Sequence, residues 1–381
     1  MTLGSQKHLF DFPEGVVYMN CAAQGPAPMA ARDAGRRAVD RKARPWEPER
    51  QALGAEMLRA RELFAGFVGA AADDIALTGA TSYAMAVAAA NLRVEPGRTV
   101  VMLEAQFPSN YYVWQRVAAR DGARVVIVPR PSDGDWTSAV LDRLGPDTGL
   151  VALPNAHWVD GGSLDLLPIS TAVHADGAAL VIDATQSIGA QPFDVRRIDP
   201  DFVACSAYKW LLSPDHSGYL YVAPRHQHGE PVEHNHATRI GEAPMTLSPG
   251  YGERFREGAS RFDQGTADSM IHVPMAVAAM EQIAAWGVDA IAGSIEPLVD
   301  RIAGEAEARG WLVPPKRHRS PHFIGIDLRR PPEPDLAERL AAENVHVSLR
   351  NGRVRVSPYL FNDVQDVERL FVALDRLVGR R

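Results

Sequence analysis

Short apolar runs and longer amphipathic segments alternate along the chain from about residue 55 to residue 224. The short runs are rich in Val, Ile and Leu, and the longer segments repeat their apolar residues at helical spacing. This alternation is typical of parallel strands that helices cover on both faces. We therefore predict an α/β fold with a mainly parallel, seven-stranded sheet. Its strands are expected at residues 75–79, 99–105, 124–129, 150–156, 179–185, 202–207 and 218–224.

The pattern changes beyond residue 224. A polar stretch with several Gly, Pro and His residues, 225–260, is expected to wrap the surface or to cross to a partner subunit. Two long helical patterns follow at 273–288 and 294–310, and short strands and helices then mix as far as the C-terminus. This mixture predicts a smaller α+β unit.

The division into domains follows from that change, which lies near residues 275–290. We expect a large domain over residues 21–280 and a small domain built from residues 1–20 and 281–381. A possible strand near 16–20 would join the N-terminal segment to the small domain. A chain of 381 residues is long enough for both domains.

Charge and composition exclude several classes of function. The net charge of −7 gives no basic field for nucleic acid or for an anionic membrane. The two cysteines, Cys21 and Cys205, fit no metal-ligand or disulfide spacing. No run reaches the ~18 apolar residues of a membrane span, and the first residues lack the apolar region of a signal peptide. We expect a cytoplasmic protein without a nucleic-acid or membrane partner.

Lys209 is the first candidate for chemistry. It follows a strand directly in SAYKWLLS (206–213), between Tyr208 and Trp210. A buried lysine loses its charge easily and forms imines with carbonyl groups. A lysine whose stem covers apolar surface while its amine reaches water would give the same pattern.

Two other segments add polar groups at strand ends. Asp183 ends the apolar strand of VIDATQSIGA (181–190), and a buried carboxylate needs a partner. That partner is either a pyridinium N–H or the first turn of a following helix. In TGATSYAMA (78–86), Ala80 and Thr81 begin a helix whose N-terminus suits a phosphate, although a plain helix cap is the commoner explanation.

These three features in this order resemble the fold type I enzymes that use pyridoxal 5′-phosphate (PLP). Within them, the chain resembles the class V aminotransferase family, which includes cysteine desulfurases, kynureninases and isopenicillin-epimerase-like proteins. The resemblance covers roughly residues 16–375. It also rests on VYMNCAAQGP (17–26), EAQFPSNYYVW (104–114), HWVDGGSLDL (157–166), SRFDQGT (260–266) and RVRVSPYLFN (353–362).

The resemblance implies a set of residues around PLP. Lys209 would hold the cofactor as a Schiff base and move protons at the substrate, and Asp183 would keep the ring nitrogen protonated. An amino acid or related amine would then react through an external aldimine and a quinonoid. The other cofactor contacts implied by the resemblance are Ala80, Thr81, Phe107, Gln186, Ser206 and Tyr208. Phe107 would cover the ring, unless it is a core residue.

Thr266 matches a residue that reaches the phosphate of the neighbouring subunit, so the resemblance implies a homodimer with shared active sites. Arg355 aligns with the arginine that grips the substrate carboxylate. Arg350 and Arg353 are nearby candidates for the same role. Alternatively, Arg355 is a surface arginine at a strand edge without a role in binding. The other substrate contacts implied are Trp158, His157, Asn20 and Ala22; the first two could instead pack in the core.

The chain also departs from its relatives. Cysteine desulfurases carry a nucleophilic cysteine shortly before the carboxylate-binding arginine, and HVSLRNGRVRVS (346–357) has none. SPDHSG (213–218) replaces a glycine-rich turn, so Ser213, Asp215 and His216 could alter phosphate contacts or substrate entry. Trp46 could line the site across a dimer or pack on the surface. The four histidines of the polar stretch suit a solvated loop better than a metal site: His226, His228, His234 and His236.

We therefore expect an enzyme, either an aminotransferase or a C–S or C–X lyase, and not a persulfide-forming cysteine desulfurase. An epimerase or a kynureninase-like hydrolase on the same scaffold is an alternative. A non-catalytic binding protein with this fold is an alternative of another class. A nucleotide-dependent dehydrogenase would require a glycine fingerprint that the sequence lacks.

Overall fold

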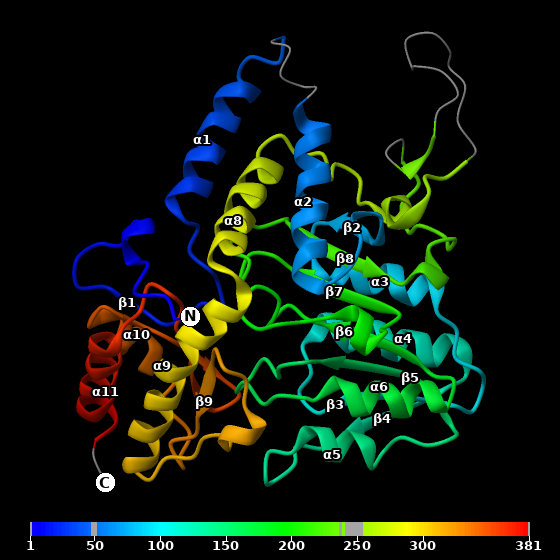
Figure 1. Cartoon of the computed structure of the whole chain (residues 1–381). Coiled ribbons are helices and arrows are strands. Elements are labelled where there is room, and N and C mark those ends of the chain that lie inside the picture. The colour runs from blue at the N-terminus through cyan, green and yellow to red at the C-terminus, as the bar shows by residue number, and fades with distance from the viewer. Residues whose placement is uncertain (1, 47–51, 236–237, 241–253, 380–381) are drawn as a thin grey trace.

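A seven-stranded sheet forms the centre of the molecule (Figure 1). The computed structural model describes residues 2–46, 52–235, 238–240 and 254–379. The strand order is β2-β8-β7-β6-β5-β3-β4, and only β8 runs against its neighbours. This confirms the predicted, mainly parallel sheet. The strands are β2 (Ile75–Thr78), β3 (Thr99–Leu103), β4 (Arg124–Val128), β5 (Thr148–Pro154), β6 (Ala179–Asp183), β7 (Phe202–Ser206) and β8 (Gly218–Val222).

Helices bury both faces of this sheet, which explains why its strands are apolar at successive positions. Along β3, Val101 and Leu103 enter one hydrophobic layer, and Val100 and Met102 enter the other. The second layer includes Trp114 of α4. Helix α2 (Ala52–Val68) precedes the first of these strands. The helices that connect the strands are α3 (Thr81–Asn91), α4 (Tyr112–Asp121), α5 (Trp136–Leu141), α6 (Leu166–Ala175) and α7 (Val195–Ile198).

The sequence patterns did not indicate α1 (Met29–Lys42), which packs against α8 (His272–Trp286). The buried face of α1 consists only of Ala31, Ala34, Gly35 and Ala38. Small residues allow the two helices to approach closely, but they leave no strong apolar stripe in the sequence.

The C-terminal part contains a separate three-stranded antiparallel sheet, with the strand order β11-β12-β9. The N-terminal strand β1 (Val17–Tyr18) pairs in parallel with β10 (Val345–His346). The sequence suggested a possible strand here, but not its partner. The remaining elements are α9 (Val288–Ala308), β9 (Ile324–Ile326), α10 (Leu336–Ala342), β11 (Ser348–Arg350), β12 (Arg353–Val356) and α11 (Val364–Val378).

Helices α8 and α9 meet at Gly287, where the chain bends by 77°. α8 packs on α1 and α2, whereas α9 packs on α11 and β9. This change of neighbours supports the division into the two predicted domains, which we retain as a proposal. Within the described residues no single helix is long and apolar enough to span a membrane, and α8 with α9 would meet those criteria only as a bent pair.

The polar stretch after β8 is described in part. His226 Nε2 donates a hydrogen bond of 2.6 Å to the Asp201 carboxylate, and its ring stacks on Phe202. His236 lies outside the described residues. Among the residues that the structure describes, no group of three or more His, Cys, Asp or Glu side chains has the arrangement of a metal site.

Candidate active site

A cavity of about 130 Å³ lies at the carboxyl ends of β5, β6 and β7. Ligands of parallel sheets bind at this edge. The cavity brings together most of the residues that the sequence suggested: Ala80, Thr81, Phe107, Trp158, Asp183, Gln186, Ser206, Tyr208 and Lys209. The remainder of its wall consists of Ser82, Gln106, Ser109, Asn110, Pro154, Ala156 and Thr185.

Lys209 lies in the turn between β7 and β8 and is only 6% exposed. This burial contradicts the alternative in which its amine reaches water. No ion pair or hydrogen bond engages the amine in the described part of the chain, and Nζ lies 5.4 Å from the centre of the Phe107 ring. Burial, together with the nearby cation of Arg355, lowers the pKa of Lys209 to about 8. The amine is therefore ready to lose its proton near neutral pH.

The N-terminal segment fixes the backbone of Lys209. The N–H of Gly25 donates to the carbonyl of Tyr208 over 2.8 Å, and the thiol of Cys21 donates to the carbonyl of Lys209 over 3.7 Å. A Cβ atom at position 25 would lie 1.9 Å from that same carbonyl oxygen. Only glycine allows this close approach.

Asp183 ends β6 and is 7% exposed. Its Oδ1 accepts a hydrogen bond of 3.0 Å from the N–H of Thr185. The residues after Thr185 form turns, and the next helix begins only at Val195, so Asp183 caps no helix. Burial raises the pKa of Asp183. An N–H donor in the cavity would stabilise its ionised form.

Three hydroxyl groups form a cluster beside the N-terminus of α3. Thr81 Oγ1 lies 2.8 Å from both Thr185 Oγ1 and Ser206 Oγ, and the N–H of Thr81 donates to Ser206 Oγ over 3.0 Å. Hydroxyl groups at the start of a helix suit a phosphate. Sequence reasoning missed Thr185, although its place two residues after Asp183 could have suggested it.

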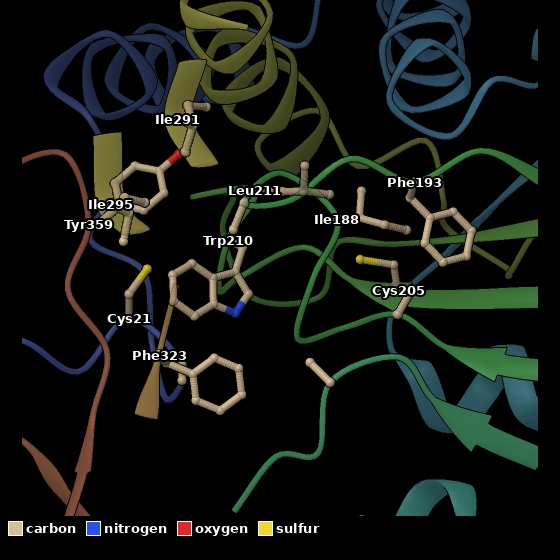
Figure 2. Close-up of a cluster of buried hydrophobic side chains, with 14 of the residues drawn as sticks. Cys21, Ile188, Phe193, Cys205, Trp210, Leu211, Ile291, Ile295, Phe323 and Tyr359 are labelled. Carbon is tan, nitrogen blue, oxygen red and sulfur yellow. The ribbon is translucent and has the colours of Figure 1, made fainter. Parts of the chain in front are cut away.

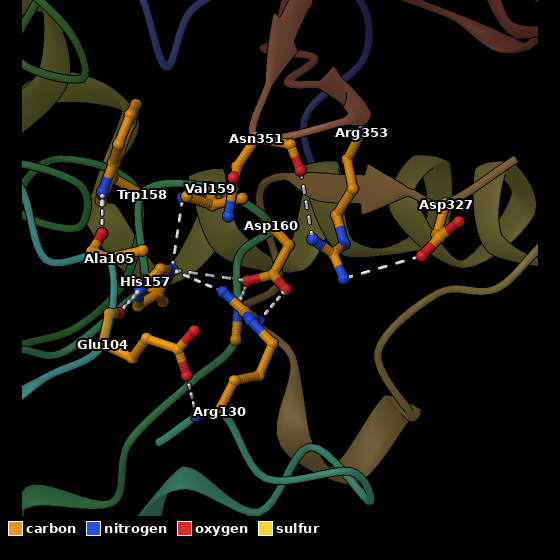
Figure 3. Close-up of polar contacts among 11 residues, drawn as sticks. Glu104, Ala105, Arg130, His157, Trp158, Val159, Asp160, Asp327, Asn351 and Arg353 are labelled. Atoms are coloured by element: carbon orange, nitrogen blue, oxygen red, sulfur yellow. Dashed lines mark hydrogen bonds and ion pairs between the residues drawn. The ribbon is translucent and has the colours of Figure 1, made fainter. Parts of the chain in front are cut away.

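Phe107 and Trp158 form an aromatic wall of the cavity. Their ring centres lie 5.4 Å apart at an interplanar angle of 85°. The indole N–H of Trp158 donates to the carbonyl of Ala105 over 2.7 Å, which fixes the ring (Figure 3). Both side chains are partly exposed, so neither is a core residue.

His157 does not reach the cavity. It is fully buried, its Nε2 lies 3.1 Å from the carbonyl oxygen of Glu104, and its Nδ1 lies 3.3 Å from Arg130 (Figure 3). Its ring stacks on Trp136 with centres 5.1 Å apart. Burial lowers its pKa to about 4. Of the two neighbours suggested as substrate contacts, the structure therefore brings only Trp158 to the cavity.

Arg355 lies in β12 and is only 1% exposed, so the alternative of a surface arginine is wrong. It does not line the cavity itself, although Trp158, to which it is bonded, does. Its Nη1 donates to the carbonyl of Trp158 over 2.7 Å, and its Nε has no hydrogen-bond partner among the described residues. No described carboxylate forms an ion pair with it, and burial lowers its pKa to about 9. By contrast, Arg353 lies 3.6 Å from Asp327 (Figure 3). Arg350 donates to the carbonyl of Leu349.

Neither Asn20 nor Ala22 lines the cavity. Asn20 forms a bridge with Ser357, and the carbonyl of Ala22 accepts a hydrogen bond of 3.0 Å from Gln186 Nε2. The N-terminal segment therefore contacts the site through Gln186.

Thr266 is exposed, has a φ of 63° and lies outside the cavity of its own chain. It lines a second cavity of about 450 Å³, together with Gly79, His216 and His272. Ser213 and Asp215 line neither cavity. Trp46 is 77% exposed.

The cavity residues fit PLP. A buried lysine whose amine has no ion pair among the described residues is available for the aldehyde, and a buried carboxylate for the pyridinium. A hydroxyl cluster at a helix start is available for the phosphate, and a partly exposed phenyl ring for the ring face. Together with the sheet topology, they define a PLP-dependent enzyme of fold type I.

The family is shown by comparison. The model of the family "Aminotransferase class-V" matches residues 44–370, so the chain belongs to this family of PLP-dependent enzymes. Isopenicillin N epimerase from Streptomyces clavuligerus is 28% identical over 96% of this chain and 95% of its own.

Two solved structures show the same fold. The apo cysteine desulfurase from Thermococcus onnurineus NA1 has a TM-score of 0.86 at 20% identity and covers 99% of both chains. A C-DES mutant with glycine covalently linked to its PLP cofactor has a TM-score of 0.86 at 18% identity, over 98% of this chain and 99% of its own.

Proposed function

We propose that this enzyme acts on an amino acid with a free carboxylate, by aminotransferase or C–S or C–X lyase chemistry, without forming a persulfide on a protein cysteine. The observation that carries the proposal is Arg355, a buried cation with no carboxylate partner among the described residues. Burying an unpaired charge is costly. A substrate carboxylate would supply the missing anion, and its two oxygens match the fork of a guanidinium group.

The other residues of the site would either bind the cofactor or transfer protons. Thr81, Thr185 and Ser206 would hold the phosphate, and Asp183 would hold a proton on the ring nitrogen. Bound PLP supplies an electron sink for the bond that is broken at the substrate α-carbon. Lys209, with a pKa lowered to about 8, would take and return a proton at that carbon.

Both cysteines are poor candidates for a persulfide. Cys21 and Cys205 are buried, and burial raises the pKa of each thiol, whereas the thiolate is the nucleophile. β11 and β12 are joined by a short turn at Asn351 and Gly352, so the segment before Arg355 is a tight hairpin without cysteine. These facts support a reaction that needs no protein sulfur.

Epimerisation is a second candidate, favoured by the similarity to isopenicillin N epimerase over nearly the whole chain. It would use the same carboxylate grip and the same lysine. It differs in returning the proton to the opposite face of the α-carbon, so that the inverted amino acid is released and no keto acid, ammonia or sulfide is formed.

The test is an absorbance titration of the protein loaded with PLP. A panel of amino acids is added, each paired with the amine that lacks its carboxylate, while keto acids, ammonia, sulfide and α-deuterium exchange are assayed. We expect one amino acid, but not its paired amine, to shift the visible band. Release of a keto acid without ammonia would indicate transamination, release of ammonia or sulfide would indicate a lyase, and deuterium exchange with inversion would indicate an epimerase. No visible band with PLP, or amines that act as well as the acids, would overturn the proposal.

A further inference from the structure

Two neighbours set the orientation of the Gln186 side chain. Its Oε1 accepts a hydrogen bond of 2.9 Å from the indole N–H of Trp210, and its Nε2 donates to the carbonyl of Ala22 over 3.0 Å. An indole N–H only donates and a backbone carbonyl only accepts. The oxygen and nitrogen of this amide therefore cannot exchange places without losing both bonds.

One N–H of Gln186 is left for the cavity. The amide nitrogen carries two hydrogens, and the carbonyl of Ala22 takes one of them. Gln186 is 4% exposed, and it lines the cavity together with Lys209 and Asp183. The bond from Trp210 to the amide oxygen also polarises the amide, which strengthens the remaining N–H as a donor.

Trp210 is itself held firmly. It is fully buried, and its ring meets that of His322 edge-on, with centres 4.4 Å apart at 89°. Phe323 and Tyr359 pack around it at 6.0 and 6.2 Å (Figure 2). His322 Nε2 in turn lies within hydrogen-bond distance of the backbone carbonyl of Gln186. The indole therefore has no room to turn away from the amide.

We propose that Trp210 is a positioning residue that acts through Gln186. Its N–H holds the amide so that Gln186 donates to the ring oxygen of bound PLP, beside the imine on the preceding residue, Lys209. A donor at that oxygen stabilises the negative charge on the oxygen and weakens its attraction for the imine proton. The imine therefore loses its proton at a lower pH. This inference rests on the proposed function, in which Lys209 carries the cofactor, and on the cofactor contact that the resemblance implies for Gln186.

The experiment is a pH titration of the visible absorbance of the PLP-loaded protein, without substrate. Trp210→Phe keeps the packing and removes the N–H, and it should move the midpoint upward by about one pH unit, which corresponds to one hydrogen bond. Trp210→His, which keeps a ring N–H, should recover part of the shift. Trp286→Phe is the matched control, because Trp286 also donates to a glutamine oxygen, that of Gln6, and lies away from the cavity lining.

Gln186→Met separates this inference from the proposed function. It should raise the midpoint by at least as much as Trp210→Phe, and the double variant should move no further than Gln186→Met alone. If Gln186→Met shifts the midpoint while Trp210→Phe does not, or if the two shifts add, the positioning role of Trp210 is wrong. If Gln186→Met changes nothing with PLP bound, the role of Gln186 itself is wrong. Should Trp210→Phe fail to fold, benzothienylalanine at position 210 removes the N–H at constant shape.

Discussion

Lys209 and Arg355 are two cations that the fold buries, and neither forms an ion pair with a carboxylate of the described residues. The charge of Asp183 acts on Lys209 and raises its pKa, but burial lowers it by more. Burial shifts the pKa of each downward, because a charge away from water is unfavourable. For the lysine this produces a reactive amine, and for the arginine the unpaired Nε is a donor that an anion could engage.

The pH dependence of cofactor attachment should reveal the lowered pKa of Lys209. The free amine is the nucleophile, so the rate at which the apoprotein forms a visible band with PLP should rise with pH and level off above a midpoint near 8. For a lysine with an unshifted pKa, this midpoint would lie at about pH 10.4. Stopped-flow absorbance measures this rate, and a rise that continues past pH 10 would contradict the prediction. Lys209→Ala should form no band.

Arg355→Ala should weaken carboxylate binding far more than Arg353→Ala does. Removing a charged hydrogen-bonding partner costs about 1.5–3 kcal/mol, so KM for the amino acid should rise roughly 10- to 100-fold with cofactor binding unchanged. Arg353 is the matched control, because it belongs to the same strand and pairs with Asp327. Steady-state kinetics distinguishes the two. An unchanged KM in Arg355→Ala would contradict the role of Arg355 and would indicate Arg350 as the carboxylate-binding residue.

The elements around the site meet through close backbone contacts. The turn after β7 that carries Lys209 is held from the N-terminal segment at Cys21 and Gly25. The loop before α6 also approaches the segment before β9 closely: a Cβ at Gly161 would lie 2.3 Å from the carbonyl oxygen of Phe323. Such approaches join segments that are far apart in the sequence.

Gly25→Ala should therefore disturb the lysine. The added methyl would collide with the carbonyl of Lys209, and overpacking of this kind costs about 1–3 kcal/mol. We expect a lower melting temperature and a lower PLP occupancy, measured by thermal unfolding and by absorbance. Gly54→Ala in α2 is the control: nothing lies within 4 Å of its Cβ, and alanine there should stabilise the helix. Equal behaviour of both variants would refute the contact.

Two buried histidines tie the stability of the whole molecule to pH. Burial lowers the pKa of His157 and of His322 to about 4, whereas both regain a value near 6.5 on unfolding. The unfolded chain then binds more protons between those values, so the free energy of unfolding should fall as the pH drops from 6.5 to 4. Each histidine would account for up to about 3 kcal/mol.

Denaturant titrations at several pH values test this loss. His157→Phe preserves the stack on Trp136 and removes one titrating group, so its stability should depend less on pH. His8→Gln, at an exposed position, should behave as the wild type. A wild-type stability that is constant from pH 6.5 to 4 would contradict the prediction.

We also propose that the active enzyme is a homodimer. Thr266 is exposed and lies outside its own chain's cavity, so the phosphate contact suggested by the sequence requires a second copy. Light scattering should give twice the chain mass, and Thr266→Ala should weaken PLP binding by about tenfold, as expected for one hydrogen bond. Thr171→Ala, on the exposed face of α6, should have no such effect. A fully active monomer would refute the proposal.

The α/β class and the order of the strands along the chain follow from the sequence alone, because they depend on local periodicity. So does the place of Asp183 at the end of a strand and of Lys209 shortly after one. The sequence did not indicate α1, whose buried face has only small residues.

The tertiary structure alone decided which neighbours face the cavity. Trp158 lines it and His157 does not, and Thr185 joins the hydroxyl cluster. Arg355 is buried and has no ion pair among the described residues, whereas Arg353 pairs with Asp327. The hydrogen bonds of Gln186 join it to Ala22 and to Trp210, which are far from it in the sequence. Such contacts arise only when distant segments are brought together, and no spacing along the chain encodes them.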